Sequence, residues 1–83
     1  MSCTVSDRKR IQWAAESLRR MIPTVGVDVH EPGMGEYYGW SLEATLSNVE
    51  SVRSDVLMAL VEEDLQLQLA QPRGEHYVVV ATA

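Results

Sequence analysis

The chain has one cysteine and no phenylalanine among its 83 residues, and its basic residues are fewer than its acidic ones. The single thiol, Cys3, excludes an intramolecular disulfide and leaves no cysteine pair for a zinc site. Without phenylalanine, a core has to be built from aliphatic side chains, methionine, tryptophan and tyrosine. The apolar content of 46% and the charged content of 23% are nevertheless ordinary for a globular domain.

Long apolar runs are also missing. No stretch approaches the roughly 18–20 apolar residues of a membrane-spanning helix, and residues 1–10 lack the apolar centre of a signal peptide. The sequence therefore predicts a cytoplasmic protein without membrane contact, forming a single domain over residues 1–83. A domain this small buries only about 60–65% of the surface of its unfolded chain, so pairing with a second copy is a common remedy.

Charge is distributed unevenly along the chain. Residues 1–22 contain five basic and two acidic residues, whereas residues 23–83 contain two basic and ten acidic residues. The net charge of −5 thus combines a basic first segment, at +3, with an acidic remainder, at −8. An acidic body repels nucleic acid, which favours protein partners.

Two amphipathic helices are predicted. Apolar residues at helical spacing indicate a helix over 6–21, which Ser6 or Thr4 can cap and which Pro23 ends. The sequence Ser47-Asn48-Val49-Glu50 has the form of a capping box and predicts the start of the second helix. Acidic residues at 62–64 are unfavourable at the negative end of a helix, so this helix should end there.

Each helix is followed by two predicted strands, over 24–31 and 40–47 in the first half and over 65–71 and 76–83 in the second. Glycine- and proline-rich turns over 32–39 and 72–75 join the strands of each pair. The two hairpins match at an offset of about 40 residues, because valines at 25, 27 and 29 correspond to leucines at 65, 67 and 69. The chain therefore contains a pseudo-repeat, 6–47 and 48–83.

Two tandem α-β-β units predict an α+β fold, with a four-stranded antiparallel sheet and both helices on one face. A right-handed crossover favours the strand order first-second-fourth-third, which places the apolar strand 76–83 in the middle. The order second-first-third-fourth satisfies the same rule. In the order of its elements, this arrangement resembles a circularly permuted ferredoxin-like sandwich.

The face of the sheet opposite the helices is predicted to be mildly apolar and acidic. Its expected members are Thr24, Asp28, His30, Glu43, Thr45, Gln66, Gln68, Val78, Val80 and Thr82. Because it lacks the aromatic and basic side chains with which such sheets bind RNA, this mode of binding is disfavoured. Val78 and Val80 at its centre instead indicate a contact with a second copy, or a solvated sheet that tolerates two valines.

Trp13 is the strongest single candidate for a binding residue, because it falls on the predicted outer side of the first helix with Lys9 and Arg20. A tryptophan beside cations can anchor a protein partner or stack on a base. It can equally lie flat over the stems of its basic neighbours.

Catalytic and cofactor motifs are not evident. The sequence contains no nucleophile elbow, phosphate loop or dinucleotide fingerprint, so we expect no enzymatic activity and no cofactor. Asp28, His30, Glu31 and His76 do not have the spacing of a metal motif, and no metal site is predicted. The two hairpin tips look alike, and they are minor candidates for contact through Glu36, Tyr37, Glu75 and His76.

The sequence therefore predicts a small non-catalytic interaction module of the acidic inhibitor, adaptor or regulatory type, acting as a homodimer. An apolar strip of the second helix, Leu57, Met58 and Val61, is its expected contact with a protein. The alternative is nucleic-acid binding through Arg8, Lys9, Arg10, Trp13, Arg19 and Arg20 of the first helix. A further alternative is a small-molecule sensor with its ligand in a groove between subunits.

Overall fold

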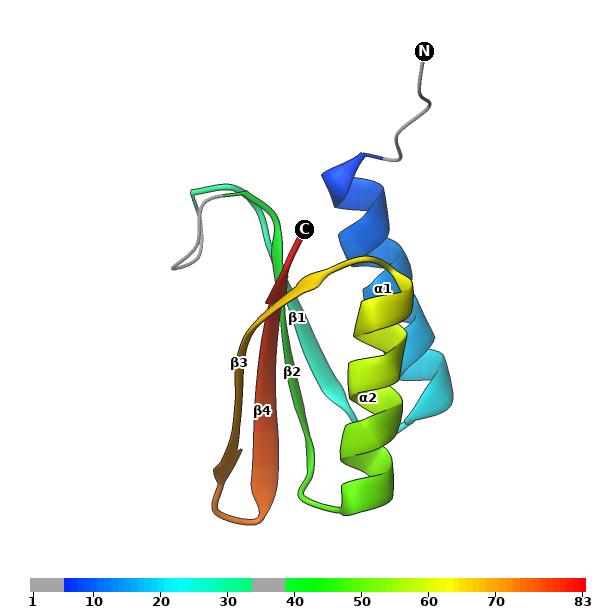
Figure 1. Cartoon of the computed structure of the whole chain (residues 1–83), viewed down its shortest axis with the longest axis vertical. Helices are drawn as coiled ribbons and strands as arrows, with labels where there is room; N and C mark the ends of the chain where they lie inside the picture. The colour runs from blue at the N-terminus through cyan, green and yellow to red at the C-terminus, as the bar shows by residue number, and fades with distance from the viewer. Residues whose placement is uncertain (1–5, 34–38) are drawn as a thin grey trace.

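The computed structural model describes residues 6–33 and 39–83. These residues form two consecutive α-β-β units (Figure 1). The elements are α1 (Asp7–Met21), β1 (Gly26–His30), β2 (Ser41–Ser47), α2 (Glu50–Glu62), β3 (Gln66–Arg73) and β4 (His76–Thr82).

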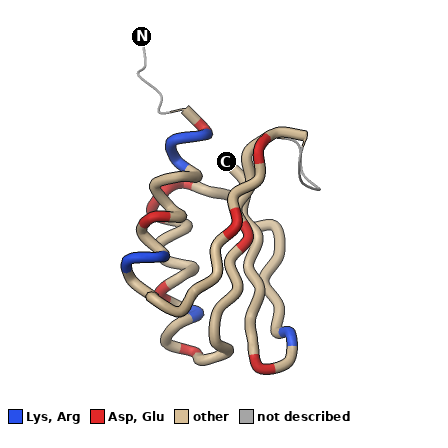
Figure 2. Tube along the Cα trace, turned by 180° about the vertical axis from the view of Figure 1, so that it is seen from behind, with Lys and Arg blue, Asp and Glu red and all other residues tan. Residues whose placement is uncertain are grey.

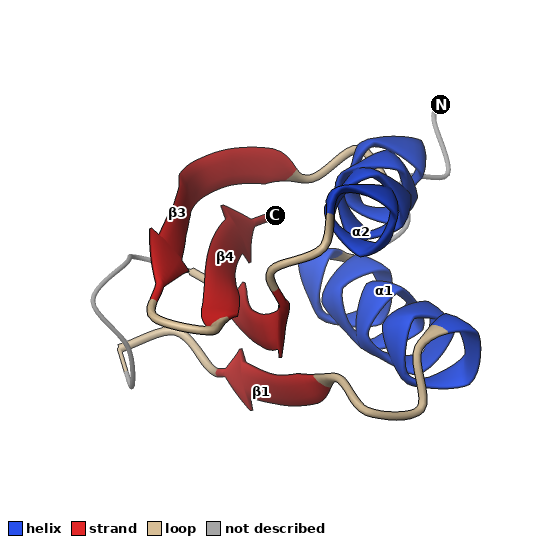
Figure 3. Ribbon diagram, turned by 90° about the horizontal axis from the view of Figure 1, so that it is seen from below, coloured by secondary structure: helices blue, strands red, loops and turns tan. Residues whose placement is uncertain are grey.

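The four strands form one antiparallel sheet in the order β1-β2-β4-β3. Both helices lie on the same face of this sheet (Figure 3), where α1 contacts β1 and β2 while α2 contacts β2 and β3. The predicted α+β class, strand order and position of the helices are confirmed. The layout is consistent with a ferredoxin-like arrangement of two helices on a four-stranded sheet.

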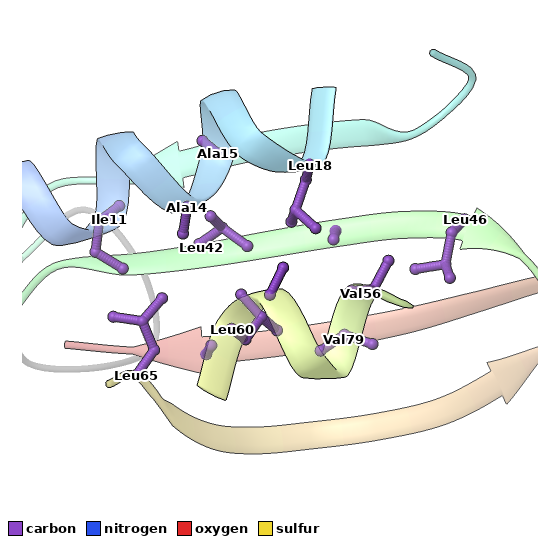
Figure 4. Close-up of a cluster of buried hydrophobic side chains, with 13 residues drawn as sticks. Ile11, Ala14, Ala15, Leu18, Leu42, Leu46, Val56, Leu60, Leu65 and Val79 are labelled. Atoms are coloured by element: carbon purple, nitrogen blue, oxygen red, sulfur yellow. The ribbon is translucent and has the colours of Figure 1, made fainter. Parts of the chain in front are cut away.

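The core lies between the two helices and the central strands. Both helices and the central strands β2 and β4 contribute aliphatic side chains to it (Figure 4). Its large members are Ile11, Leu18, Leu42, Leu46, Val56, Leu60, Leu65 and Val79, and its small members are Ala14, Ala15, Ala44, Ala59 and Ala81. Burial of these apolar groups supplies the main driving force for folding.

The beginning of α1 follows the sequence closely. The Ser6 hydroxyl accepts a hydrogen bond from the backbone N–H of Lys9 at 3.3 Å, and Asp7 occupies the first turn. This is the expected N-cap, with a carboxylate near the positive end of the helix dipole. The helix ends at Met21, two residues before Pro23, because the residue preceding a proline disfavours helical geometry.

The capping box predicted for α2 is wrong. Ser47 is the last residue of β2, where it pairs with His76 of β4, and the N-cap of α2 is Val49, without a side-chain capping bond. Asn48 is also held by the sheet, since its N–H donates to the carbonyl of Glu75 at 3.2 Å. Cross-strand pairing therefore keeps the serine in the sheet and delays the start of the helix.

The end of α2 is a Schellman motif. The N–H of Leu65 donates to the carbonyl of Leu60 at 3.1 Å, and the N–H of Asp64 donates to the carbonyl of Val61 at 2.9 Å. Leu65 and Leu60 both belong to the core, as the apolar contact of this motif requires. Asp64 adopts a φ of 59°, a left-handed conformation that normally favours glycine.

The predicted position of Gln66 and Gln68 on the open face implies that the leucines between and after them face the helices, but strand β3 departs from this alternation. The register shifts between Leu67, which pairs with Ala81, and Leu69, which pairs with Val80. This bulge moves Leu69 to the side of the sheet away from the helices, because one extra residue inverts the alternation that follows. β3 also continues to Arg73, so the expected turn over 72–75 shrinks to residues 74–75.

We expect Asp64→Gly to raise the free energy of unfolding by about 0.5–1 kcal/mol, because glycine adopts a left-handed backbone without the steric cost of a Cβ atom. Urea denaturation monitored by circular dichroism would measure the change. Asp64→Ala is the matched control, since it removes the same negative charge but keeps the Cβ atom. Equal stability of the two variants would contradict the explanation from backbone conformation.

Candidate functional site

The two valines predicted on the face of the sheet opposite the helices are largely covered. Val78 lies between Thr45 of β2 and Gln71 of β3 and is only 2% exposed, while Val80 is half-buried. The expectation that these valines form an exposed patch is therefore wrong for Val78, because its neighbours on the sheet shield it. Their proposed contact with a second copy stays a prediction, with little surface to support it.

The polar residues considered for a metal site are not brought together. Asp28 lies directly opposite Glu43, and His30 lies opposite Ser41 at one end of β2. Figure 2 shows acidic positions close together on neighbouring strands. His76 pairs with the last residue of β2, at the other end of that strand. Within residues 6–33 and 39–83, no group of three or more histidine, cysteine, aspartate or glutamate side chains could hold a metal ion.

Exposed apolar side chains gather instead on α2 and at the beginning of β3. Met58 is 61% exposed and Val61 is 70% exposed, while Leu57 is half-buried beside them. Leu67 points to the helix side of the sheet, because it pairs with the core residue Ala81, yet it is 50% exposed. We call Leu57, Met58, Val61 and Leu67 the α2–β3 surface.

Leu67 was missed by sequence reasoning, which placed its neighbours Gln66 and Gln68 on the open face of the sheet and did not consider Leu67 as a contact residue. Its exposure follows from its place in the sheet. β3 is an edge strand, and Figure 3 shows that it extends beyond the part of the sheet that the two helices cover. The predicted strand order already placed this strand at an edge of the sheet, and from that position the exposure of Leu67 could have been inferred.

Two of the basic residues on α1 are engaged within the domain. The Arg10 guanidinium donates to the Asp7 carboxylate at 2.6 Å and to the backbone carbonyl of Asp64 at 3.0 Å. The Arg19 guanidinium donates to the carbonyl of Val27, on the edge strand β1, at 3.2 Å. These arginines connect α1 to the end of α2 and to the sheet, so they are less available to a ligand.

The other cations of α1 are exposed. Lys9 and Arg20 lie with Trp13 and Glu16 on the side of the helix opposite its buried residues, and all four are exposed. Among the described residues, neither cation donates a side-chain hydrogen bond or forms an ion pair within 4 Å. We call Lys9, Trp13, Glu16 and Arg20 the outer face of α1.

Only one of the predicted hairpin tips can be located. Glu36 and Tyr37 lie outside the described residues, whereas Glu75 and His76 are exposed at the turn between β3 and β4. Close to this turn, the Arg53 guanidinium lies 5.3 Å from the ring centre of Tyr77. Sequence reasoning did not find this contact, which ties the first turns of α2 to β4.

None of the described helices combines the length and the apolar character needed to cross a membrane. Compared with known protein families, curated protein sequences and solved structures, the chain shows no match. The candidate surfaces therefore rest on the chemistry and geometry of this chain alone.

Arg19→Ala is expected to lower the free energy of unfolding by about 0.5–1 kcal/mol, because the Val27 carbonyl loses a charged donor at an exposed position. Amide hydrogen exchange in β1 should accelerate, and chemical denaturation would give the change in stability. Arg20→Ala is the control, with the same side-chain loss one residue further along and no contact to the sheet. A loss of stability as large in Arg20→Ala would contradict this role of Arg19.

Proposed function

We propose that this chain is a small cytoplasmic interaction module without catalytic activity, and that it self-associates through the α2–β3 surface. The observation that carries the proposal is the exposure of Met58, Val61 and Leu67. Contiguous apolar side chains in contact with water are unfavourable, and on folded domains they commonly mark an interface. Isolated exposed apolar residues are ordinary, but these belong to adjoining elements, since α2 contacts β3.

The sequence of α2 supports this role, because apolar residues occur on both sides of the helix. Val56, Ala59 and Leu60 face the core, where they are buried within the domain. Met58 and Val61 are directed elsewhere and contribute little to the stability of the isolated domain. A helix that is apolar on two sides is typical of a helix buried on two sides, and a partner would supply the second.

A second copy of the chain is the occupant that the dipole of α2 favours. Residues 62–64 are acidic, and the last turn of α2 contains no basic residue, so the negative end of this helix dipole lacks compensation. In a twofold pair with antiparallel copies of α2, each acidic end would lie beside the positive N-terminal end of the other helix. Twofold homodimers are also the commonest assemblies of soluble proteins.

Nucleic-acid binding through α1 is a weaker proposal. It relied on five cations, and two of them, Arg10 and Arg19, donate to groups within the domain. The cations of α1 without a hydrogen bond or ion pair among the described residues are Arg8, Lys9 and Arg20, next to a body of charge −8. The proposal of a small-molecule sensor requires a dimer, and no particular residue supports it.

Val61→Glu should weaken self-association at least about tenfold, because a charge placed in an apolar interface must lose its water. Sedimentation equilibrium over a range of protein concentrations would measure the dimer dissociation constant. Since Val61 is 70% exposed, the fold should be unaffected, and circular dichroism would verify this.

Gln71→Glu is the matched control, because it adds the same charge at an exposed position of β3 that pairs with Val78, on the other face of the sheet. Its dissociation constant should stay close to that of the wild type. A wild-type chain that is monomeric at all accessible concentrations would overturn the proposal. Equal weakening by both substitutions would place the contact elsewhere.

A further inference from the structure

The outer face of α1 has the composition of a binding surface rather than of a solvated helix. Trp13 is 46% exposed, although tryptophan is normally highly buried. The cation–π contact present among the described residues joins Arg53 to Tyr77 and does not involve Trp13. Nearly half of the Trp13 surface is therefore accessible to a ligand.

The cations next to Trp13, Lys9 and Arg20, form no ion pair among the described residues. Glu16 lies one turn before Arg20, where an ion pair on the helix surface would be favourable. The two ion pairs among the described residues both belong to Arg10 and do not include Glu16, Lys9 or Arg20. An exposed aromatic ring between two cations that have no partner among the described residues is complementary to a ligand with an apolar group between two negative charges.

We propose that the outer face of α1 binds a short acidic segment of another protein, with an apolar residue on Trp13 and a carboxylate at each of Lys9 and Arg20. The helix rise sets the spacing of these groups. Along the axis, Trp13 lies about 6 Å from Lys9 and about 10.5 Å from Arg20. An extended peptide covers about 3.3 Å per residue and alternates its side chains between two faces. Groups that contact one surface are therefore two or four residues apart, and the matching pattern is acid-x-apolar-x-x-x-acid, in which the long Arg20 side chain spans the remaining distance.

A protein segment fits this face better than a nucleic acid does. Duplex DNA carries one negative charge per about 1.7 Å, and its affinity depends on many phosphate contacts. The outer face of α1 offers two cations and one acid, on a domain that carries a net charge of −5. Two carboxylates flanking an apolar residue need only two cations and avoid most of this repulsion.

This inference is independent of the proposed self-association, because the outer face of α1 shares no residue with the α2–β3 surface. The two can therefore fail separately. Val61→Glu should bind an acidic peptide with the wild-type affinity, whether or not the chain forms a dimer.

The test is an NMR titration of the ¹⁵N-labelled full chain with the peptide Ser-Glu-Ser-Leu-Ser-Ser-Ser-Glu-Ser at low salt. We expect a dissociation constant of about 0.1–1 mM, with the largest shifts at the Trp13 indole and in α1. Arg20→Glu and Trp13→Ala should each weaken binding at least about fivefold. Both positions are exposed, so dispersed spectra should show that the variants are folded.

Arg73→Glu is the matched control, because it reverses an exposed arginine at the β3–β4 hairpin, away from α1. It should change the affinity less than about twofold. No shifts at about 5 mM peptide would overturn the proposal, as would equal binding of a peptide with both glutamates replaced by glutamine. Tighter binding of a 12-nucleotide single strand that Arg20→Glu abolishes would overturn it in favour of nucleic acid.

Discussion

Packing of both helices against the central strands β2 and β4 is the constraint on which the rest of the structure depends. Leucine and valine side chains from both layers meet there, and alanines on the helices and strands allow close approach. Two helices cover the central strands but leave the helix side of the edge strand β3 partly open (Figure 3). Exposure of Leu67 on β3 and of Val61 on α2 is therefore a consequence of how the core is closed, and it places the candidate interface.

The sequence predicted the elements and their order from the periodicity of apolar residues and from one strongly apolar strand. Helical spacing placed α1, and the strongly apolar segment 76–83 indicated a central strand, which selected the correct order. The failures have a common cause. Ser47 was expected to cap α2, and Leu69 was expected to face the core, but pairing with β4 decided both positions. Such pairing joins segments distant in sequence, which local patterns do not record.

The residues of the candidate sites could be predicted from the sequence, but which of their side chains are accessible to a ligand could not. Lys9 and Arg10 are neighbours of the same charge, yet Arg10 reaches the carbonyl of Asp64, 54 residues away, while Lys9 faces solvent. Arg19 and Arg20 differ in the same way, because only Arg19 is oriented toward β1. A helical projection gives the side on which a cation lies. Whether that cation is free depends on which carbonyl groups the fold brings within its reach.

The two proposed surfaces rely on different physics, and salt affects them in opposite directions. Association of two chains that each carry −5 is opposed by their mutual repulsion, which ions screen, whereas the apolar contact through Val61 is not weakened by screening. Attraction of an acidic segment to Lys9 and Arg20 is electrostatic and decreases as the ionic strength rises. Added salt therefore favours occupation of the α2–β3 surface and disfavours occupation of the outer face of α1, so that ionic strength separates the two activities within one domain.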